Sequence, residues 1–135
     1  MTSPPRSRLL HAVAVSACLA LAGLVGASPA VAATKTCKAG NTNYPNSNPG
    51  GYFTSLKVTN VRCSSGAKLM VAYYKCRRKN GQGIEGKCKQ STVNSLRCTE
   101  SRPSSARVPG QEFNARVTCK SGSKKIVHTY QQNLG

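Results

Sequence analysis

The chain has 135 residues, 20 of them Lys or Arg against only 3 acidic residues, so its formal net charge is +17. This length is enough for one domain with a modest core. All three acids are glutamates, Glu85, Glu100 and Glu112, which leaves few carboxylates for paired acid–base chemistry.

The first 32 residues have the three parts of a cleavable secretory signal peptide. Arg6 and Arg8 give a basic start, Leu9–Val25 is almost wholly apolar, and Ala30–Ala32 supplies small residues where signal peptidase reads them. We expect signal peptidase to cleave after Ala32, with cleavage after Ala33 as the alternative. The rest of the chain would then be secreted. A membrane anchor needs about 20 apolar residues, and this stretch is shorter. The sequence therefore predicts an extracellular protein without a transmembrane anchor.

Six cysteines remain after this cleavage, and they predict three disulfides, because such a number in a short exported chain is typical of a disulfide framework. Loss of Cys18 with the leader leaves this even number, and the apolar run continuing beyond Cys18 argues against a lipid attached there. Zinc is a poor alternative, because no C-x-x-C pair occurs and only His128 survives cleavage. We favour a Cys76–Cys88 bridge, which closes a short segment after a predicted helix. The other four cysteines stay unassigned: Cys37, Cys63, Cys98 and Cys119.

The first part of the exported chain predicts a loop followed by a strand. Residues 39–51 are dense in Asn, Gly, Pro and Ser, so we expect residues 33–51 to form a flexible N-terminal arm and residues 52–135 to form a single domain. Tyr52–Arg62 predicts a strand, because Leu56 and Val58 share one face while Lys57 and Thr59 share the other.

A helix is predicted over Gly66–Lys79, with Ser64 or Ser65 as its N-cap. Asn80-Gly81 supplies the stop. Its apolar stripe is expected to consist of residues at helical spacing, namely Ala67, Met70, Val71 and Tyr74. Its C-terminal end carries three cations, which favourably meet the negative end of the helix dipole: Arg77, Arg78 and Lys79.

The rest of the chain predicts strands and irregular connections. Gly81–Gln90 is a basic loop, Val93–Cys98 a short strand candidate and Ser101–Gly110 an irregular connection. An antiparallel hairpin follows, turning at Ser121–Ser123. Its apolar face is predicted by alternation and consists of Phe113, Ala115, Val117, Cys119, Ile126, His128 and Tyr130. The opposite face of its first strand carries Asn114, Arg116, Thr118 and Lys120.

This order of elements predicts an α+β fold in which one helix packs on a small antiparallel sheet. The expected layout is a strand, the helix and then strands ending in the C-terminal hairpin, stapled by three disulfides.

Three segments of the chain resemble a group of small secreted cysteine-rich proteins of actinobacteria. These segments are GGYFTSLKVTNVRCSSGAKLMVAYYKC, LRCTESR and FNARVTCKSGSKKIVHTYQQN. The shared pattern is V-x-x-V-x-C-x-x-(G/A) at the start of a helix and V-x-C-x-x-G in the C-terminal strands. The likeness spans nearly all of Gly50–Asn133. The group has no assigned activity, so the resemblance implies secretion and a compact disulfide-bonded module and assigns no functional residues.

The charge favours anionic partners. The leader removes two arginines, so 18 Lys and Arg remain against three acids, a formal +15. Such a field attracts anionic polymers, surfaces or an acidic protein, although it is also compatible with solubility alone. We expect binding to depend on salt and to include nucleic acid only non-specifically, because no RNP or helix-turn-helix motif occurs. The candidate anion-binding residues are Arg77, Arg78, Lys79, Lys87 and Lys89 around the helix end, and Lys120, Lys124 and Lys125 at the hairpin tip.

We expect a monomeric, non-catalytic protein without cofactor or metal, because neither a nucleophile elbow nor a phosphate-binding loop is present. One alternative is a secreted ribonuclease-like hydrolase using Glu112, Arg116 and His128. However, alternation puts Glu112 opposite the apolar face of its strand and His128 on that face. Another alternative, an inhibitor of an extracellular enzyme, fits a disulfide-braced scaffold but has no motif to support it.

Overall fold

The computed structural model describes residues 32–40, 42, 44–45, 50–79 and 83–135. Nearly all of the predicted signal peptide lies outside the described residues, as does the predicted helix stop at Asn80-Gly81.

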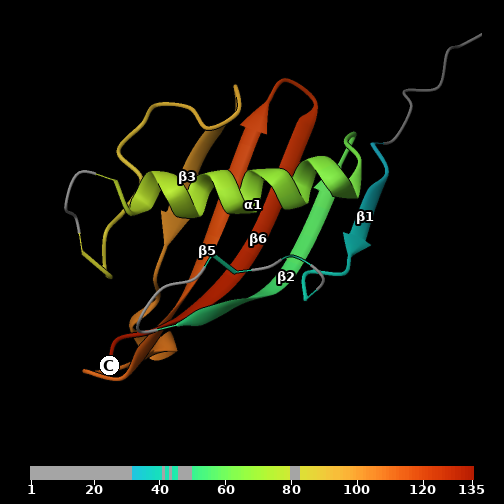
Figure 1. Ribbon diagram of the computed structural model, residues 1–135. Coiled ribbons are helices and arrows are strands. Elements are labelled where there is room, and N and C mark those ends of the chain that lie inside the picture. The colour runs from blue at the N-terminus through green and yellow to red at the C-terminus, as the bar shows by residue number, and fades with distance from the viewer. Residues whose placement is uncertain (1–31, 41, 43, 46–49, 80–82) are drawn as a thin grey trace, which may run out of the picture.

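One long helix lies across one face of an antiparallel sheet (Figure 1). The sheet order is β1-β2-β6-β5-β3, and β4 pairs with the start of β5. The α+β class and the C-terminal hairpin are confirmed, but the sheet is larger than predicted because β1 and β4 join it. The elements are β1 (Thr34–Cys37), β2 (Gly51–Thr59), α1 (Cys63–Arg77), β3 (Arg97–Ser101), η1 (Ser104–Ala106), β4 (Arg107–Val108), β5 (Glu112–Ser121) and β6 (Lys124–Asn133).

The alternation read from the sequence places the hairpin correctly. Every apolar position predicted for its inner face is buried, with Val117 and Cys119 fully enclosed. Gly122 takes a φ of 53° at the first position of the two-residue turn between β5 and β6. This conformation suits glycine and matches the twist of the two strands.

Strand β2 has the predicted faces and one irregularity. Leu56 and Val58 are buried, while Lys57 is exposed. The register with β6 shifts between Phe53 and Ser55, so Thr54 is an extra residue. This β-bulge turns the hydroxyls of both Thr54 and Ser55 toward Thr129, with which each forms a hydrogen bond.

The helix begins earlier than predicted, and its N-cap prediction is wrong. It starts at Cys63, and Arg62 occupies the N-cap position without a side-chain hydrogen bond. Ser64 and Ser65 therefore lie inside the first turn, not before it. A disulfide from Cys63 to Cys37 joins this first turn to β1.

The buried face of the helix is also rotated from the predicted stripe. Leu69 and Tyr73 are buried together with Met70 and Tyr74, whereas Ala67 and Val71 are only partly buried. The helix ends at Arg77, and the backbone N–H of Arg78 bonds to the carbonyl of Tyr74.

Three further segments differ from the sequence predictions. The expected arm contributes edge strand β1, and its Tyr44 packs edge-on against Phe53 and Tyr74. The strand expected from Val93 begins only at Arg97, because Asn94 and Ser95 take positive φ angles in a tight turn. The connection after β3 is irregular as expected, except for the short η1 and β4.

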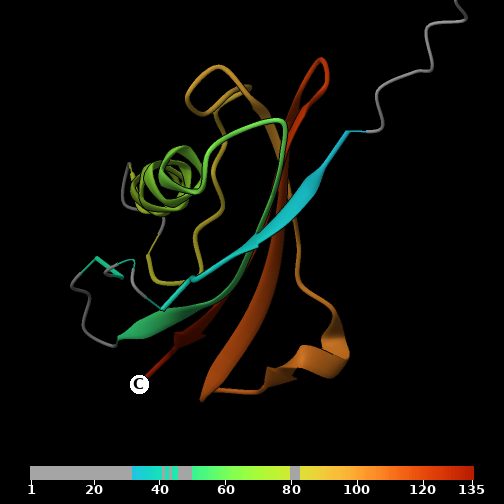
Figure 2. The ribbon, with the colours of Figure 1, turned by 90° about the vertical axis from the view of Figure 1, so that its right-hand side faces the viewer.

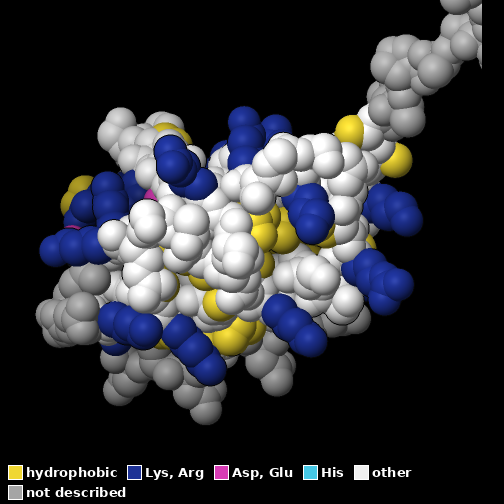
Figure 3. All heavy atoms as spheres, turned by 90° about the horizontal axis from the view of Figure 1, so that it is seen from above, with side chains coloured by type: hydrophobic (Ala, Val, Ile, Leu, Met, Phe, Trp, Pro, Cys, Tyr) yellow, Lys and Arg dark blue, Asp and Glu magenta, His cyan; other side chains and the backbone are white. Residues whose placement is uncertain are grey.

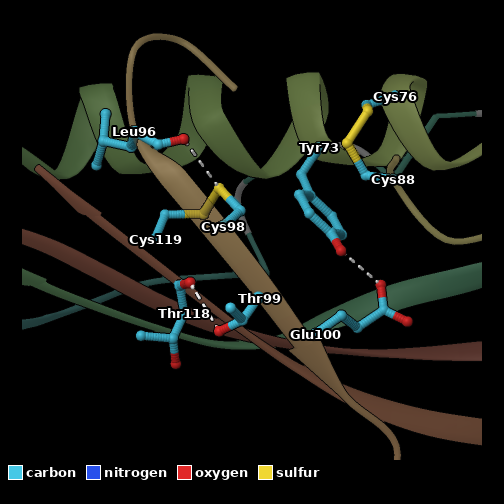
Figure 4. Close-up of a disulfide and its surroundings, with 9 residues drawn as sticks. All are labelled: Tyr73, Cys76, Cys88, Leu96, Cys98, Thr99, Glu100, Thr118 and Cys119. Carbon is cyan, nitrogen blue, oxygen red and sulfur yellow. Dashed lines mark hydrogen bonds between the residues drawn. A yellow bond between two sulfur atoms is a disulfide. The ribbon is translucent and has the colours of Figure 1, made fainter. Parts of the chain in front are cut away.

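The three predicted disulfides are present and tie the layers together. Cys37–Cys63 joins β1 to the start of α1, and Cys76–Cys88 joins the last helical turn to the following loop. The second of these is the pairing that the sequence favoured. Cys98–Cys119 links directly opposed residues of β3 and β5, on the side of the sheet that faces the helix (Figure 4).

Candidate anion-binding face

Only one face of the sheet is covered by the helix. Figure 2 shows α1 on one side; among the described residues, the other side carries only the short η1–β4 segment near one end. We call this second side the open face. It is formed by the outward side chains of β2, β6, β5 and β3, and Figure 4 shows two of them, Thr99 and Thr118, pointing away from the helix.

Strand register brings three cations into one row on the open face. Arg97 of β3 lies directly opposite Lys120 of β5, which lies directly opposite Lys125 of β6. All three side chains are exposed. Neighbouring strands are about 4.8 Å apart, so each pair repels across a short distance and costs stability. We call these three residues the cation row.

A shallow hollow adjoins the cation row. It is lined by Arg97, Lys120 and the residues around them, including Thr99 and Thr118. Guanidinium and ammonium groups only donate hydrogen bonds, and the Thr118 hydroxyl can donate as well, whereas the Thr99 hydroxyl donates to the Thr118 carbonyl at 3.4 Å. The hollow is therefore chemically suited to phosphate, sulfate or carboxylate groups.

The three glutamates have partners of their own and do not neutralise the cation row. Glu100 pairs with Arg102 and accepts a 2.9 Å hydrogen bond from the Tyr73 hydroxyl on the helix side (Figure 4). Glu85 pairs with Arg107, at 2.5 Å, and Glu112 accepts a hydrogen bond from Gln131. Figure 3 views the molecule from above, toward the end that holds the turn between β5 and β6. Lys and Arg side chains surround this end, with little acidic surface between them.

Arg77 does not belong to a surface anion site. It is fully buried, because its guanidinium lies over the rings of Tyr74 and Tyr130 at 5.1 and 4.8 Å. The guanidinium also donates hydrogen bonds to the carbonyls of Ile84 and Gly86, and the side-chain oxygens of Tyr44 and Gln132 accept further ones. The residue is a structural cross-link between the helix end and the next loop, and its prediction as a surface cation is corrected.

The remaining candidates fall into separate groups. Lys79, Lys87 and Lys89 are exposed near the Cys76–Cys88 bridge, and Arg78 is partly buried beside them. Lys124 lies on the helix side of the hairpin, where it lines a groove with Lys68 and Leu69. Of the predicted hairpin-tip cluster, only Lys120 and Lys125 therefore share the open face.

Sequence reasoning missed Arg97 as a site residue. Its place in the cation row depends on the pairing of β3 with β5, which no local pattern encodes. Alternation along β5 did predict the outward direction of Arg116 and Lys120, and both are exposed. The missing information was which strand lies beside them.

The residues of the hydrolase alternative lie on opposite sides of the sheet. His128 is fully buried on the helix side, and burial lowers its pKa to about 4. Glu112 lies on the open face, where its carboxylate accepts a hydrogen bond from the Gln131 side-chain amide. This geometry does not bring the two side chains to one substrate.

Within the described ranges, no group of three or more His, Cys, Asp or Glu residues is placed to hold a metal ion. The same part of the chain contains no helix long and apolar enough to cross a membrane. No protein-family model matches the chain, and comparisons with curated proteins and with solved structures find no match. The resemblance to small secreted proteins of actinobacteria stays a prediction.

Proposed function

We propose that this protein is a secreted, non-catalytic binder of anionic polymers, and that the open face of its sheet is the binding surface. The observation that carries the proposal is the cation row, Arg97, Lys120 and Lys125. Three like charges lie side by side across three strands, with none of the chain's glutamates among them. Like charges on neighbouring strands destabilise the sheet, and a bound anionic ligand would offset their repulsion. Ligand binding therefore gives a physical reason for three cations at these positions.

A flat surface suits a polymer better than a small anion. The open face is not enclosed, so a small ion there stays hydrated and binds weakly. A polymer presents many anionic groups at once, and each contact releases counterions. The exposed positive charge elsewhere on the molecule would steer such a ligand toward the protein.

Export is part of the proposal. The leader pattern of residues 1–32 supports it, and the three disulfides are bonds that persist in oxidising compartments. Intact mass spectrometry of protein recovered from culture medium tests this part. We expect a chain that begins at Ala33 and lacks six cysteine hydrogens; free thiols or a retained leader would contradict it.

Binding to heparin over a salt series tests the surface. Replacing the cation row (Arg97→Gln, Lys120→Gln, Lys125→Gln) should weaken binding more than tenfold at about 0.1 M salt. The slope of log K against log salt should fall by about 2–3. The matched control removes three exposed charges elsewhere (Lys68→Gln, Lys87→Gln, Lys89→Gln). We expect it to change the slope by less than about 1, because these residues lie off the open face.

Equal losses in the two triple variants would mean that binding follows net charge and not the open face. No loss in the first variant would reject the cation row altogether.

A further inference from the structure

The open face has a second, chemically different end. Tyr52 of β2 lies opposite Gln131 of β6, six residues along that strand from Lys125. At about 3.3 Å per residue, this places the two ends roughly 20 Å apart. The end around Tyr52 therefore belongs to the same continuous surface as the cation row, but carries none of its three charges.

Side-chain hydrogen bonds hold this end in a fixed arrangement. The Tyr52 hydroxyl donates a 2.6 Å hydrogen bond to the Gln131 side-chain oxygen, and the Gln131 amide donates to Glu112. This hydrogen bond ties the end of the Tyr52 side chain to the side chain of its cross-strand partner on β6. Tyr52 is nevertheless 51% exposed, one of only two large hydrophobic side chains exposed among the described residues.

We infer that the polymer bound by the open face is an anionic polysaccharide, with one sugar ring stacked on Tyr52 while its charged groups reach the cation row. This inference rests on the proposed function and adds the class of polymer. An exposed aromatic ring beside a side-chain amide and a carboxylate is suited to a sugar, which has apolar C–H faces and many hydroxyl donors. A carboxylate also has acceptor positions beyond the one that Gln131 uses.

The same groups disfavour the other anionic polymers. A nucleic acid offers Glu112 at most one ribose hydroxyl per nucleotide, whereas each sugar of a polysaccharide offers several hydroxyls. A protein partner usually requires an apolar centre, and the open face offers mainly hydroxyl, amide and charged side chains. A sugar polymer fits both ends, because its hydroxyls can bind at Glu112 and its anionic groups at the cation row.

Paired polymers test the assignment by isothermal titration calorimetry with the disulfide-bonded exported protein. Polygalacturonate is a chain of carboxylated sugars, poly-L-glutamate carries carboxylates without sugar, and poly(U) carries phosphates and bases. We expect Tyr52→Ala to weaken polygalacturonate binding about tenfold, the size of one lost stacking contact, and poly-L-glutamate binding less than about twofold. Tyr52→Phe keeps the ring and should stay within about threefold of the original protein for polygalacturonate.

The outcomes separate this inference from the proposed function. If the triple cation-row variant weakens both carboxylate polymers but Tyr52→Ala affects neither, the sugar assignment fails and the proposed function stands. If the triple variant affects no polymer, both fail. A loss of poly(U) binding in Tyr52→Ala as large as the loss for polygalacturonate would assign the ring to nucleic-acid bases instead. Far-UV circular dichroism of each variant checks that the fold is kept. We expect it to be kept, because the replaced side chains are exposed.

Discussion

His128 shows how strongly a single buried side chain depends on its protonation state. Its ring lies 5.8 Å from that of Tyr73 and 6.1 Å from that of Phe53, centroid to centroid, and neither imidazole nitrogen has a hydrogen-bond partner. A charged imidazolium here would be fully buried among aromatic rings without a hydrogen-bond partner. Burial therefore keeps His128 neutral and lowers its pKa to about 4 from 6.5.

This lowered pKa predicts a loss of stability in mild acid. The unfolded chain takes up a proton at His128 near pH 6.5, but the folded chain does so only near pH 4, so stability falls as the pH falls through this window. The contribution is about 3 kcal/mol. Urea unfolding at pH 7 and pH 4 should therefore show a drop in the free energy of unfolding about 3 kcal/mol larger in the original protein than in His128→Leu. Equal drops would contradict the account, since the carboxylates contribute equally to both proteins.

Arg77 shows what a residue's sequence neighbourhood does not reveal. In the sequence it is the first of three cations at a helix end, a pattern that is typical of a solvated terminus. In the folded chain, rings from α1, β5 and β6 surround it, and Gln132 of β6 accepts one of its hydrogen bonds. These partners are up to 55 residues away, so local sequence patterns could not predict the burial of Arg77.

At the scale of elements, the contact between α1 and β2 depends on Gly66. A Cβ at this position would lie 2.8 Å from a methyl group of Val58 and 3.1 Å from one of Leu56. Glycine weakens a helix interior, so its presence here has a packing reason, which is the close approach of the helix to the sheet.

Gly66→Ala should therefore destabilise the domain, even though alanine favours the helix by about 1 kcal/mol. Overpacking against Val58 and Leu56 should outweigh that gain and lower the free energy of unfolding by about 1–2 kcal/mol net. Urea unfolding measures this difference. The control is Ser65→Ala, an exposed neighbour, which should change stability by less than about 0.5 kcal/mol. A Gly66→Ala protein as stable as the original would show that the helix can move away at no cost.

The elements with period-two alternation were predictable, and the pairing between distant elements was not. The faces of β2 and of the β5–β6 hairpin follow from their alternating residues because one side of each is buried. Edge strand β1 has only four residues, mostly exposed, and its partner is β2, so no local pattern indicated it. The cation row depends on the β3–β5 register, which is long-range, and for this reason the sequence yielded two of its three members.

At the scale of the whole molecule, the two sides of the sheet have different roles. The helix side contains the aromatic core, the disulfide between β3 and β5, and the buried Arg77 and His128. The open face contributes little to that core and instead presents cations, hydroxyls and one exposed tyrosine. Disulfides and the helix-side core stabilise the fold, which leaves the residues of the open face available for binding.

The most direct test of this two-sided account is to locate the bound polymer on the protein by NMR. Lysine side-chain Cε–Hε signals report each ammonium group separately during titration with a heparin fragment. We predict that Lys120 and Lys125 shift together at low ligand concentration, while Lys68, Lys87 and Lys89 change little. Uniform shifts of all lysines, or shifts led by Lys87 and Lys89, would contradict binding at the open face.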